Sequence, residues 1–208
     1  MKAFFLFTGL LTLNLCQGQL ALLHFSIVET DSLHIYPSKY LLDTPITKNG
    51  KSGLFTGKEI HAISIKHLGI DTLYPNNRYW ANEQIYLNSN KTIIAATIVI
   101  GRKDPKDSIL LIVIYNIKTE ERLLVIEGAS HQKIEGAMKQ TVNSWIMDLD
   151  NDGDLDIAIM KDLVDYELPN EYSDNISGVE GFGYYLKDDK MEFDYLSQEN
   201  YSTFQIKK

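Results

Sequence analysis

The sequence has little cysteine, little positive charge and no long apolar run. Cys16 is the one cysteine among 208 residues, so no disulfide can form within the chain. Lys and Arg number 20 against 28 Asp and Glu, which gives a formal net charge of −8. Without a basic cluster the chain cannot displace counterions from phosphates. We therefore expect no nucleic acid partner and no attraction to anionic membranes.

The composition is typical of a globular protein. Hydrophobic residues make up 44% and charged residues 23% of the chain, which is enough apolar material to fill a core without metal or disulfide staples. The length fits one folding unit.

The N terminus has the features of an export signal. Lys2 precedes an apolar run, residues 3–16, that is too short to span a membrane and has the size of a secretory hydrophobic region. Cys16 and Gly18 are small residues at the positions required for cleavage after Gly18. We predict a signal peptide at residues 1–18, no membrane span, and a secreted or periplasmic mature chain of residues 19–208 without a thiol nucleophile.

A lipid anchor is an alternative outcome of this segment. Residues 13–16 resemble a bacterial lipobox, in which Cys16 would carry the lipid, although Leu15 is bulky where a small residue is preferred. The two alternatives differ in whether Cys16 is removed or retained.

Apolar residues in the mature chain recur with a period of two, and short polar turns separate the runs. The runs that predict strands are residues 20–28, 59–66, 84–88, 92–100, 108–116, 122–127, the segment around Trp145, 155–160, 183–186 and 191–195. Residues 134–141 and 162–168 have some helical character, and residues 36–58 are interpreted as a long loop. We predict a single all-β domain over residues 19–208, built of antiparallel, blade-like meanders packed face to face as a partial propeller or a sandwich, with little helix.

Two of these runs are apolar on both sides of the strand. They are residues 92–100 and 109–114. A strand of this kind must be covered on both faces, so we expect both to be central strands.

The loop from Asp148 to Asp156 contains the main candidate site. Aspartates occupy its first, third, fifth, seventh and ninth positions, and Gly153 occupies the sixth. Unscreened carboxylates repel by about 1 kcal/mol per pair at roughly 4 Å in water, so the loop needs a cation to become compact. Oxygen ligands on a flexible loop favour a hard ion, and their number suits Ca²⁺. The candidate metal ligands are Asp148, Asp150, Asp152, Asp154 and Asp156.

The loop lacks the features of an EF-hand. Its twelfth position is Ile159 where a bidentate glutamate would be needed, and both flanks are predicted strands. Residues 142–160 instead resemble the FG-GAP or VCBS repeat of integrin α-type β-propellers, whose Asp-x-Asp-x-Asp-Gly-x-x-Asp loop joins two strands of a blade. Residues 181–195 are similar to the hairpin that completes such a unit. The resemblance implies a blade-like calcium unit at about residues 142–196, with Asp154 binding the ion through its main-chain carbonyl.

Other candidate groups are weaker. Residues 45–52 imitate the end of a phosphate-binding loop, but they lack its first glycine and its strand–helix frame. His61 and His67 would need partners from another strand to bind zinc. His131 lies in no recognisable catalytic motif.

The C-terminal third is rich in aromatic residues, which suit either the binding of a peptide or sugar or ordinary strand packing. We expect an exported calcium-binding, non-enzymatic β-module that binds a protein or glycan. The alternative is an exported, glycan-acting hydrolase with a structural calcium, for which Asp162 with Asp165 or Glu167 would supply the carboxylates.

Overall fold

The computed structural model describes most of the chain after residue 21. The described residues are 22–48, 51–55, 57–61, 66–68, 70, 77–101, 108–133, 138–165 and 178–196. The predicted signal peptide, Cys16, Glu167 and residues 197–208 lie outside them, and the side chain of His67 is also outside the described set. Within these ranges, no helix has the length and apolar character that crossing a membrane requires.

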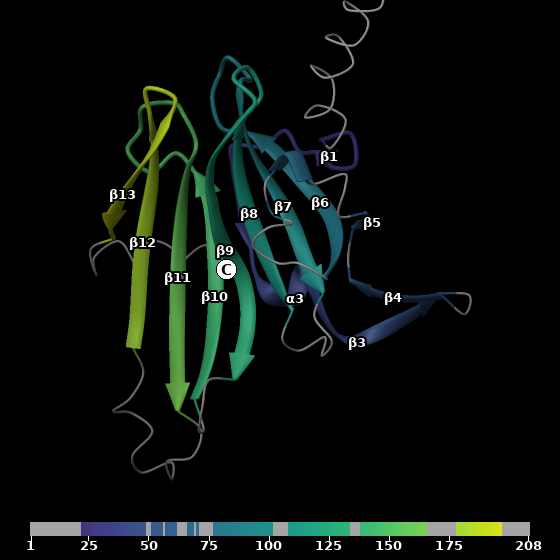
Figure 1. The fold of residues 1–208 in the computed structure, drawn as a ribbon. Helices are drawn as coiled ribbons and strands as arrows, with labels where there is room; N and C mark the ends of the chain where they lie inside the picture. Colours follow the sequence, from purple (N-terminus) through teal and green to yellow (C-terminus); the bar gives the residue numbers. More distant parts are fainter. Residues whose placement is uncertain are drawn as a thin grey trace, which may run out of the picture.

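One 11-stranded sheet dominates the protein (Figure 1). Its main path is β1-β6-β7-β8-β9-β10-β11-β12-β13, with β5 beside β6 and β2 beside β10, and every pair except β1–β6 is antiparallel. The strands are β1 (Ser26–Ile27), β2 (Ser32–Ile35), β5 (Lys58–Ile60), β6 (Arg78–Tyr86), β7 (Ile93–Gly101), β8 (Ile109–Asn116), β9 (Glu121–Lys133), β10 (Met138–Met147), β11 (Asp156–Asp165), β12 (Gly178–Lys187) and β13 (Lys190–Tyr195). The prediction of an antiparallel, all-β fold is confirmed.

The segment interpreted as a long loop is structured, so that interpretation was wrong. It contains the short helix α3 (Pro37–Tyr40) and a separate two-stranded sheet of β3 (Leu41–Lys48) and β4 (Lys51–Phe55). Pro37 begins the helix, where its missing N–H costs nothing. Gly53 thus lies in a strand of a hairpin and not in an irregular linker.

The helical character expected for residues 134–141 and 162–168 was also wrong where the structure describes them, while residues 134–137 and 166–168 lie outside the described residues. Residues 138–141 begin β10, and residues 162–165 end β11. These two ends pair with each other in register, Met138 opposite Asp165 and Thr141 opposite Asp162. The pairing of the two long strands overrides the weak local preference. The short helix η1 (Lys66–Leu68) is the other helical element among the described residues.

The central strands β7 and β8 are buried along their whole length, as their apolar sequences predict. Alternate residues contribute to two different cores: Ile112 and Ile114 to one, Leu111 and Val113 to the other. Leu68 and Phe25, the residue just before β1, pack in the second core. Both faces of these strands are therefore covered.

The sheet divides at β10. Only its first half pairs with β9, through residues 139–142, whereas Ser144–Met147 pairs with β2. Residues of both halves then meet in one core, including Ile112 of β8 and Ile157 of β11. The two meanders thus belong to one continuous sheet and share a core, which is the packing expected of meanders that face each other.

Candidate metal site

The aspartate loop joins β10 to β11 at one end of the sheet. Two of its residues have left-handed backbone conformations: Asn151 with a φ of 64° and Gly153 with a φ of 95°. Glycine takes such a φ without steric cost, and asparagine is among the residues that tolerate it best. The turn at these residues brings the two ends of the loop back together.

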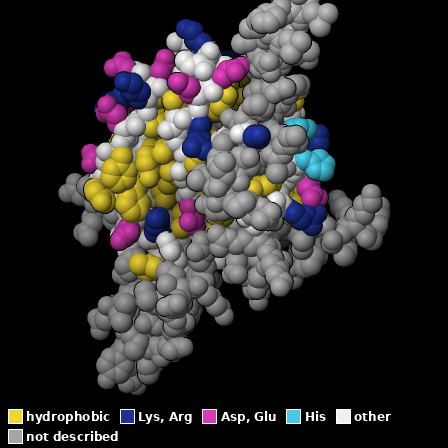
Figure 2. Space-filling view, in the orientation of Figure 1, with side chains coloured by type: hydrophobic (Ala, Val, Ile, Leu, Met, Phe, Trp, Pro, Cys, Tyr) yellow, Lys and Arg dark blue, Asp and Glu magenta, His cyan; other side chains and the backbone are white. Residues whose placement is uncertain are grey.

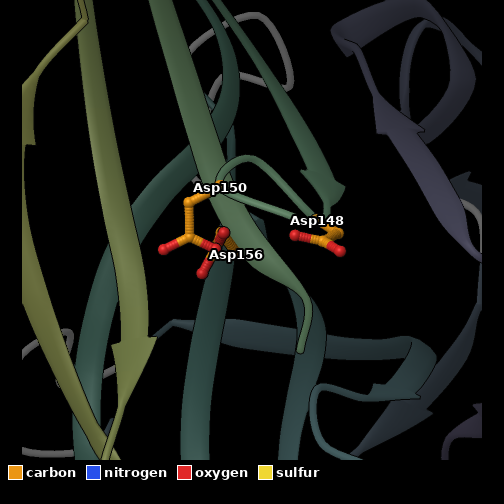
Figure 3. A group of neighbouring side chains, drawn as sticks. All are labelled: Asp148, Asp150 and Asp156. Atoms are coloured by element: carbon orange, nitrogen blue, oxygen red, sulfur yellow. The ribbon is translucent and has the colours of Figure 1, made fainter. Parts of the chain in front are cut away.

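Three of the five predicted ligands converge. Each of Asp148, Asp150 and Asp156 offers a carboxylate oxygen, and these oxygens all lie within 4.8 Å of one another (Figure 3). Asp150 is exposed, Asp148 is half-buried and Asp156 is fully buried. No other group of three or more metal-ligating side chains occurs among the residues that the structure describes. The arrangement could hold a metal ion.

Backbone N–H groups hold the loop carboxylates in place. Asp148 accepts hydrogen bonds from the N–H of Asn151 at 2.7 Å and of Gly153 at 3.1 Å. The N–H of Asp152 donates to Asp150 at 3.3 Å, and the N–H of Asp154 donates to Asp152 at 2.9 Å. These bonds are Asx-type turns, in which each aspartate orders the backbone that follows it. These local hydrogen bonds order the turn of the loop.

Asp156 ties the loop to the next strand. Its Oδ2 accepts from the N–H of Leu149 at 2.9 Å, and its Oδ1 accepts from the N–H of Leu186 in β12 at 2.8 Å. The backbone ladder between β11 and β12 begins at Ile157 opposite Tyr184. The Asp156 carboxylate therefore supplies the acceptor that the ladder no longer offers to Leu186.

Burial has a strong effect on this carboxylate. It raises the pKa of Asp156 to about 6, although the hydrogen bonds from Leu186 and Leu149 lower it, and the carboxylates of Asp150 and Asp152 raise it further. A negative charge at this position is costly in the absence of a nearby positive charge. A bound cation would provide that charge.

Asp152 and Asp154 do not join the group of three. Asp154 is half-buried, and its pKa is raised by burial and by Asp152, while a hydrogen bond with the backbone of Ser89 lowers it. Asp152 is exposed, and one of its oxygens accepts the N–H of Asp154. The side chain of Asp154 thus faces the β6–β7 turn and is not among the converging oxygens.

Two further parts of the protein hold the loop. The N–H of Leu155 donates to the carbonyl of Leu87, just after β6, at 2.6 Å. On the other side, Lys187 Nζ lies 3.9 Å from Asp150 Oδ2. The sequence analysis did not identify Lys187, Leu186 or Leu87, because no local pattern links residues so far apart along the chain. The similarity of residues 181–195 to a completing hairpin was the only available signal.

The other candidates are placed differently. Residues 45–52 fall largely in the β3–β4 hairpin, which is not the setting of a phosphate-binding loop. His61 is exposed, and Nδ1 of His131 lies 3.1 Å from the hydroxyl of Thr141 on the neighbouring strand. Asp162 is on β11, while the side chain of Asp165 is outside the described set.

Comparisons with family models, with curated proteins and with solved structures gave no match. The fold and the loop define the class: an all-β protein with an aspartate cluster that could bind a metal at one end of an open sheet.

Proposed function

We propose that the protein is an exported, non-enzymatic β-module that binds Ca²⁺ in the loop from Asp148 to Asp156 and uses its sheet to bind a protein or glycan. The observation that carries this proposal is the convergence of Asp148, Asp150 and Asp156, with Asp156 buried. Three carboxylates at this separation repel each other. A bound cation attracts all three, and this attraction outweighs the repulsion between them.

The ligand chemistry favours Ca²⁺ over Mg²⁺. All the converging atoms are carboxylate oxygens, which suit hard cations. Mg²⁺ requires near-ideal octahedral geometry and retains several waters, whereas Ca²⁺ accepts six to eight oxygens in flexible geometry. A loop whose side chains can adjust suits the larger ion. The resemblance to the FG-GAP type of loop supports the same ion.

The proposed role of the ion is structural. Its ligands lie where β10 ends and β11 begins, and Asp156 is bonded to β12. An ion in the loop would thus fix three adjacent strands relative to one another. Binding of a protein or glycan is what the resemblance implies for a module of this kind.

Thermal unfolding with and without Ca²⁺ tests the proposal. For an affinity of about 10⁻³ M, a tenfold excess of ion should stabilise the folded state by about 1.4 kcal/mol and raise Tm by a few degrees relative to chelator. Asp150→Asn should reduce this rise. Asp154→Asn is the matched control, with the same change of charge four residues along the loop, and should reduce it less because the Asp154 side chain is outside the converging group. A wild-type Tm that is the same in Ca²⁺ and in chelator would count against the site.

A further inference from the structure

The last strand of the sheet has an open edge. On the described part of the chain β13 pairs with β12 alone. By contrast, the outer edge of β6 at the other end of the sheet is covered by β1 and β5. An uncovered edge strand presents unpaired backbone donors and acceptors, which can pair with another chain.

Aromatic rings cover one face of this edge. Phe193 is 51% exposed and Tyr195 is 71% exposed, and their rings lie 5.2 Å apart. Phe182 and Tyr184 of β12 lie beside them, with ring centroids 5.4 to 5.9 Å from those of Phe193 and Tyr195. Figure 2 shows hydrophobic side chains gathered on the side of the molecule where β12 and β13 lie in Figure 1. We call these four residues the aromatic ridge.

The strand register shows which backbone groups face outward. Asp188 and Asp189 form the two-residue turn between the strands, both with positive φ, as in a type I′ hairpin. The N–H of Leu196 donates to Gly181 across the pair. Because inward and outward residues alternate along an antiparallel strand, the N–H and C=O groups of Phe193 and Tyr195 point toward the open edge.

The two faces of β13 have different chemistry. Phe193 and Tyr195 are on the ridge side, while the exposed Glu192 and Asp194 are on the opposite side, which Lys190 shares at the turn end of the strand. An added strand would place every second residue next to the ridge and the residues between them next to the two carboxylates.

A second copy of the chain meets like charges in several antiparallel registers. An antiparallel pair of β13 strands centred on Glu192 or on Asp194 places that carboxylate opposite itself. A pair centred on Phe193 places Glu192 opposite Asp194 on both sides. Like charges that face each other directly across two strands are destabilising, so these pairs are unfavourable. A pair centred on Glu192 also places Lys190 opposite Asp194, so self-pairing is an alternative outcome that the concentration dependence of hydrogen exchange, described below, distinguishes from peptide docking.

A sugar is also a poor occupant. Stacking on a sugar is best served by a flat ring platform, but neighbouring rings of the ridge are tilted by 30° to 75° relative to one another. The outward backbone groups of β13 suit the regular spacing of a peptide strand and have no counterpart in sugar stacking.

We propose that β13 is a docking edge for an extended peptide segment of a partner protein in which apolar residues alternate with Lys or Arg. The segment adds to the sheet as a further strand, with its apolar residues on the aromatic ridge and its basic residues beside Glu192 and Asp194. This inference rests on the binding role proposed above and specifies the class of partner.

A capped peptide of alternating valine and lysine tests this proposal on the full-length mature protein. Titration followed by backbone amide spectra should move the resonances of Met191, Phe193 and Tyr195, and salt should weaken the binding. A control peptide with glutamate in place of lysine should bind about tenfold more weakly, because attractive cross-strand pairs become repulsive. Absence of binding, or equal binding of the two peptides, would overturn the proposal.

A pair of variants at Phe193 separates backbone pairing from side-chain contact, and a double variant tests the charges. Phe193→Ala removes the ring and keeps the outward N–H, whereas Phe193→Pro removes both and leaves the inward ladder to β12 intact. The proline variant should bind between about twofold and tenfold more weakly than the alanine variant, and equal affinities would refute strand addition. Replacing Glu192 and Asp194 together by lysine should reverse the preference to the glutamate peptide, and a preference that does not change would refute the charge argument.

Hydrogen exchange shows whether the edge is free before the peptide is added. The Phe193 amide should exchange fast in the free protein and slowly in the complex, while the inward amides of Glu192 and Asp194 stay protected in both. Slow exchange of Phe193 in the free protein would mean that the edge is already covered, by other residues of the chain or, if protection rises with protein concentration, by a second copy. Either result would overturn the proposal.

The titration is carried out in Ca²⁺ and in chelator to separate this inference from the calcium proposal. Peptide binding in both buffers, without a Tm response to Ca²⁺, would reject the ion and retain the docking edge. A Tm response without peptide binding would reject the docking edge and retain the ion.

Discussion

Strands β7 and β8 differ from strands β12 and β13 in what surrounds them. Every residue of β7 and β8 is buried, whereas most of β13 is exposed. The former strands are held between two cores and offer nothing to solvent except their turns. The latter strands lie at the end of the sheet, beside the aspartate loop. The completely buried strands and the candidate metal site thus lie in different parts of one sheet, although residues of both parts share a core.

The two halves meet at the aspartate loop. Leu155 donates a hydrogen bond to Leu87 next to β6, and Asp156 accepts one from Leu186 in β12. The loop is thus connected to both halves. Measuring the stability of a variant with and without Ca²⁺ therefore shows whether the substitution acts through the loop.

The largest expected difference between the halves is in core truncation. Ile112 of β8 is completely buried, so Ile112→Ala should lower the free energy of unfolding by about 2–5 kcal/mol. Phe193→Ala at the half-exposed edge should cost only about 1 kcal/mol, mainly from lost ring contacts. Denaturant unfolding at fixed Ca²⁺ measures both changes. Similar costs for the two variants would contradict the division between scaffold and edge.

Substitution of one glycine in each half should cause smaller losses of stability. The dependence of these losses on Ca²⁺ distinguishes the two variants. A Cβ on Gly128 of β9 would lie 2.6 Å from Ile112 Cγ1, so Gly128→Ala should cost about 1–3 kcal/mol by overpacking. A Cβ on Gly153 would meet nothing within 4 Å, and Gly153→Ala should cost about 1–2 kcal/mol through its φ of 95°. Unfolding of both variants in Ca²⁺ and in chelator measures these costs.

The two glycine variants should respond differently to the ion. Gly128→Ala should lose the same stability in both buffers, because Gly128 on β9 and Ile112 on β8 are not part of the loop and supply no ligand. Gly153→Ala should also lose part of the stabilisation by Ca²⁺, since the turn at this residue brings the ligands together. A full calcium response in Gly153→Ala would show that the turn is not needed for binding.

The sequence alone predicted the antiparallel sheet and its central strands, because alternation and uniformly apolar runs report burial directly. It did not predict the β3–β4 hairpin, whose prolines and glycines resemble those of a loop. It also assigned helical character to the ends of β10 and β11. Those residues are strands because they pair with each other, and pairing between segments is not encoded in either segment alone.

The site was predicted in part for a similar reason. The alternation of aspartates around Gly153 marked the loop, and three of the five candidates converge there. Which three depends on tertiary contacts: Asp156 is placed by Leu186, and Asp154 is turned toward Ser89. The contribution of β12 lies thirty residues along the chain, and no spacing rule within the loop specifies it.

The last difference between the two parts of the sheet is a pH dependence of the aspartate loop. The pKa of Asp156 is raised to about 6 by burial, so between about pH 4 and pH 6 the folded protein without metal holds a proton that the unfolded chain has released. The metal-free protein should therefore lose stability as the pH rises through this window. Ca²⁺ needs the ionised carboxylate, so its affinity should rise over the same window and become constant above about pH 6, by up to about tenfold per pH unit. Calorimetric titration with Ca²⁺ at pH 5 and pH 7 measures the expected rise in affinity. Tm measured in chelator at both pH values checks the expected fall in stability of the metal-free protein. The control is Asp150→Asn, which should weaken binding at both pH values and keep the dependence. An affinity that is equal at pH 5 and pH 7 would show that the ion does not compete with a proton on Asp156, and would place the ion on exposed carboxylates.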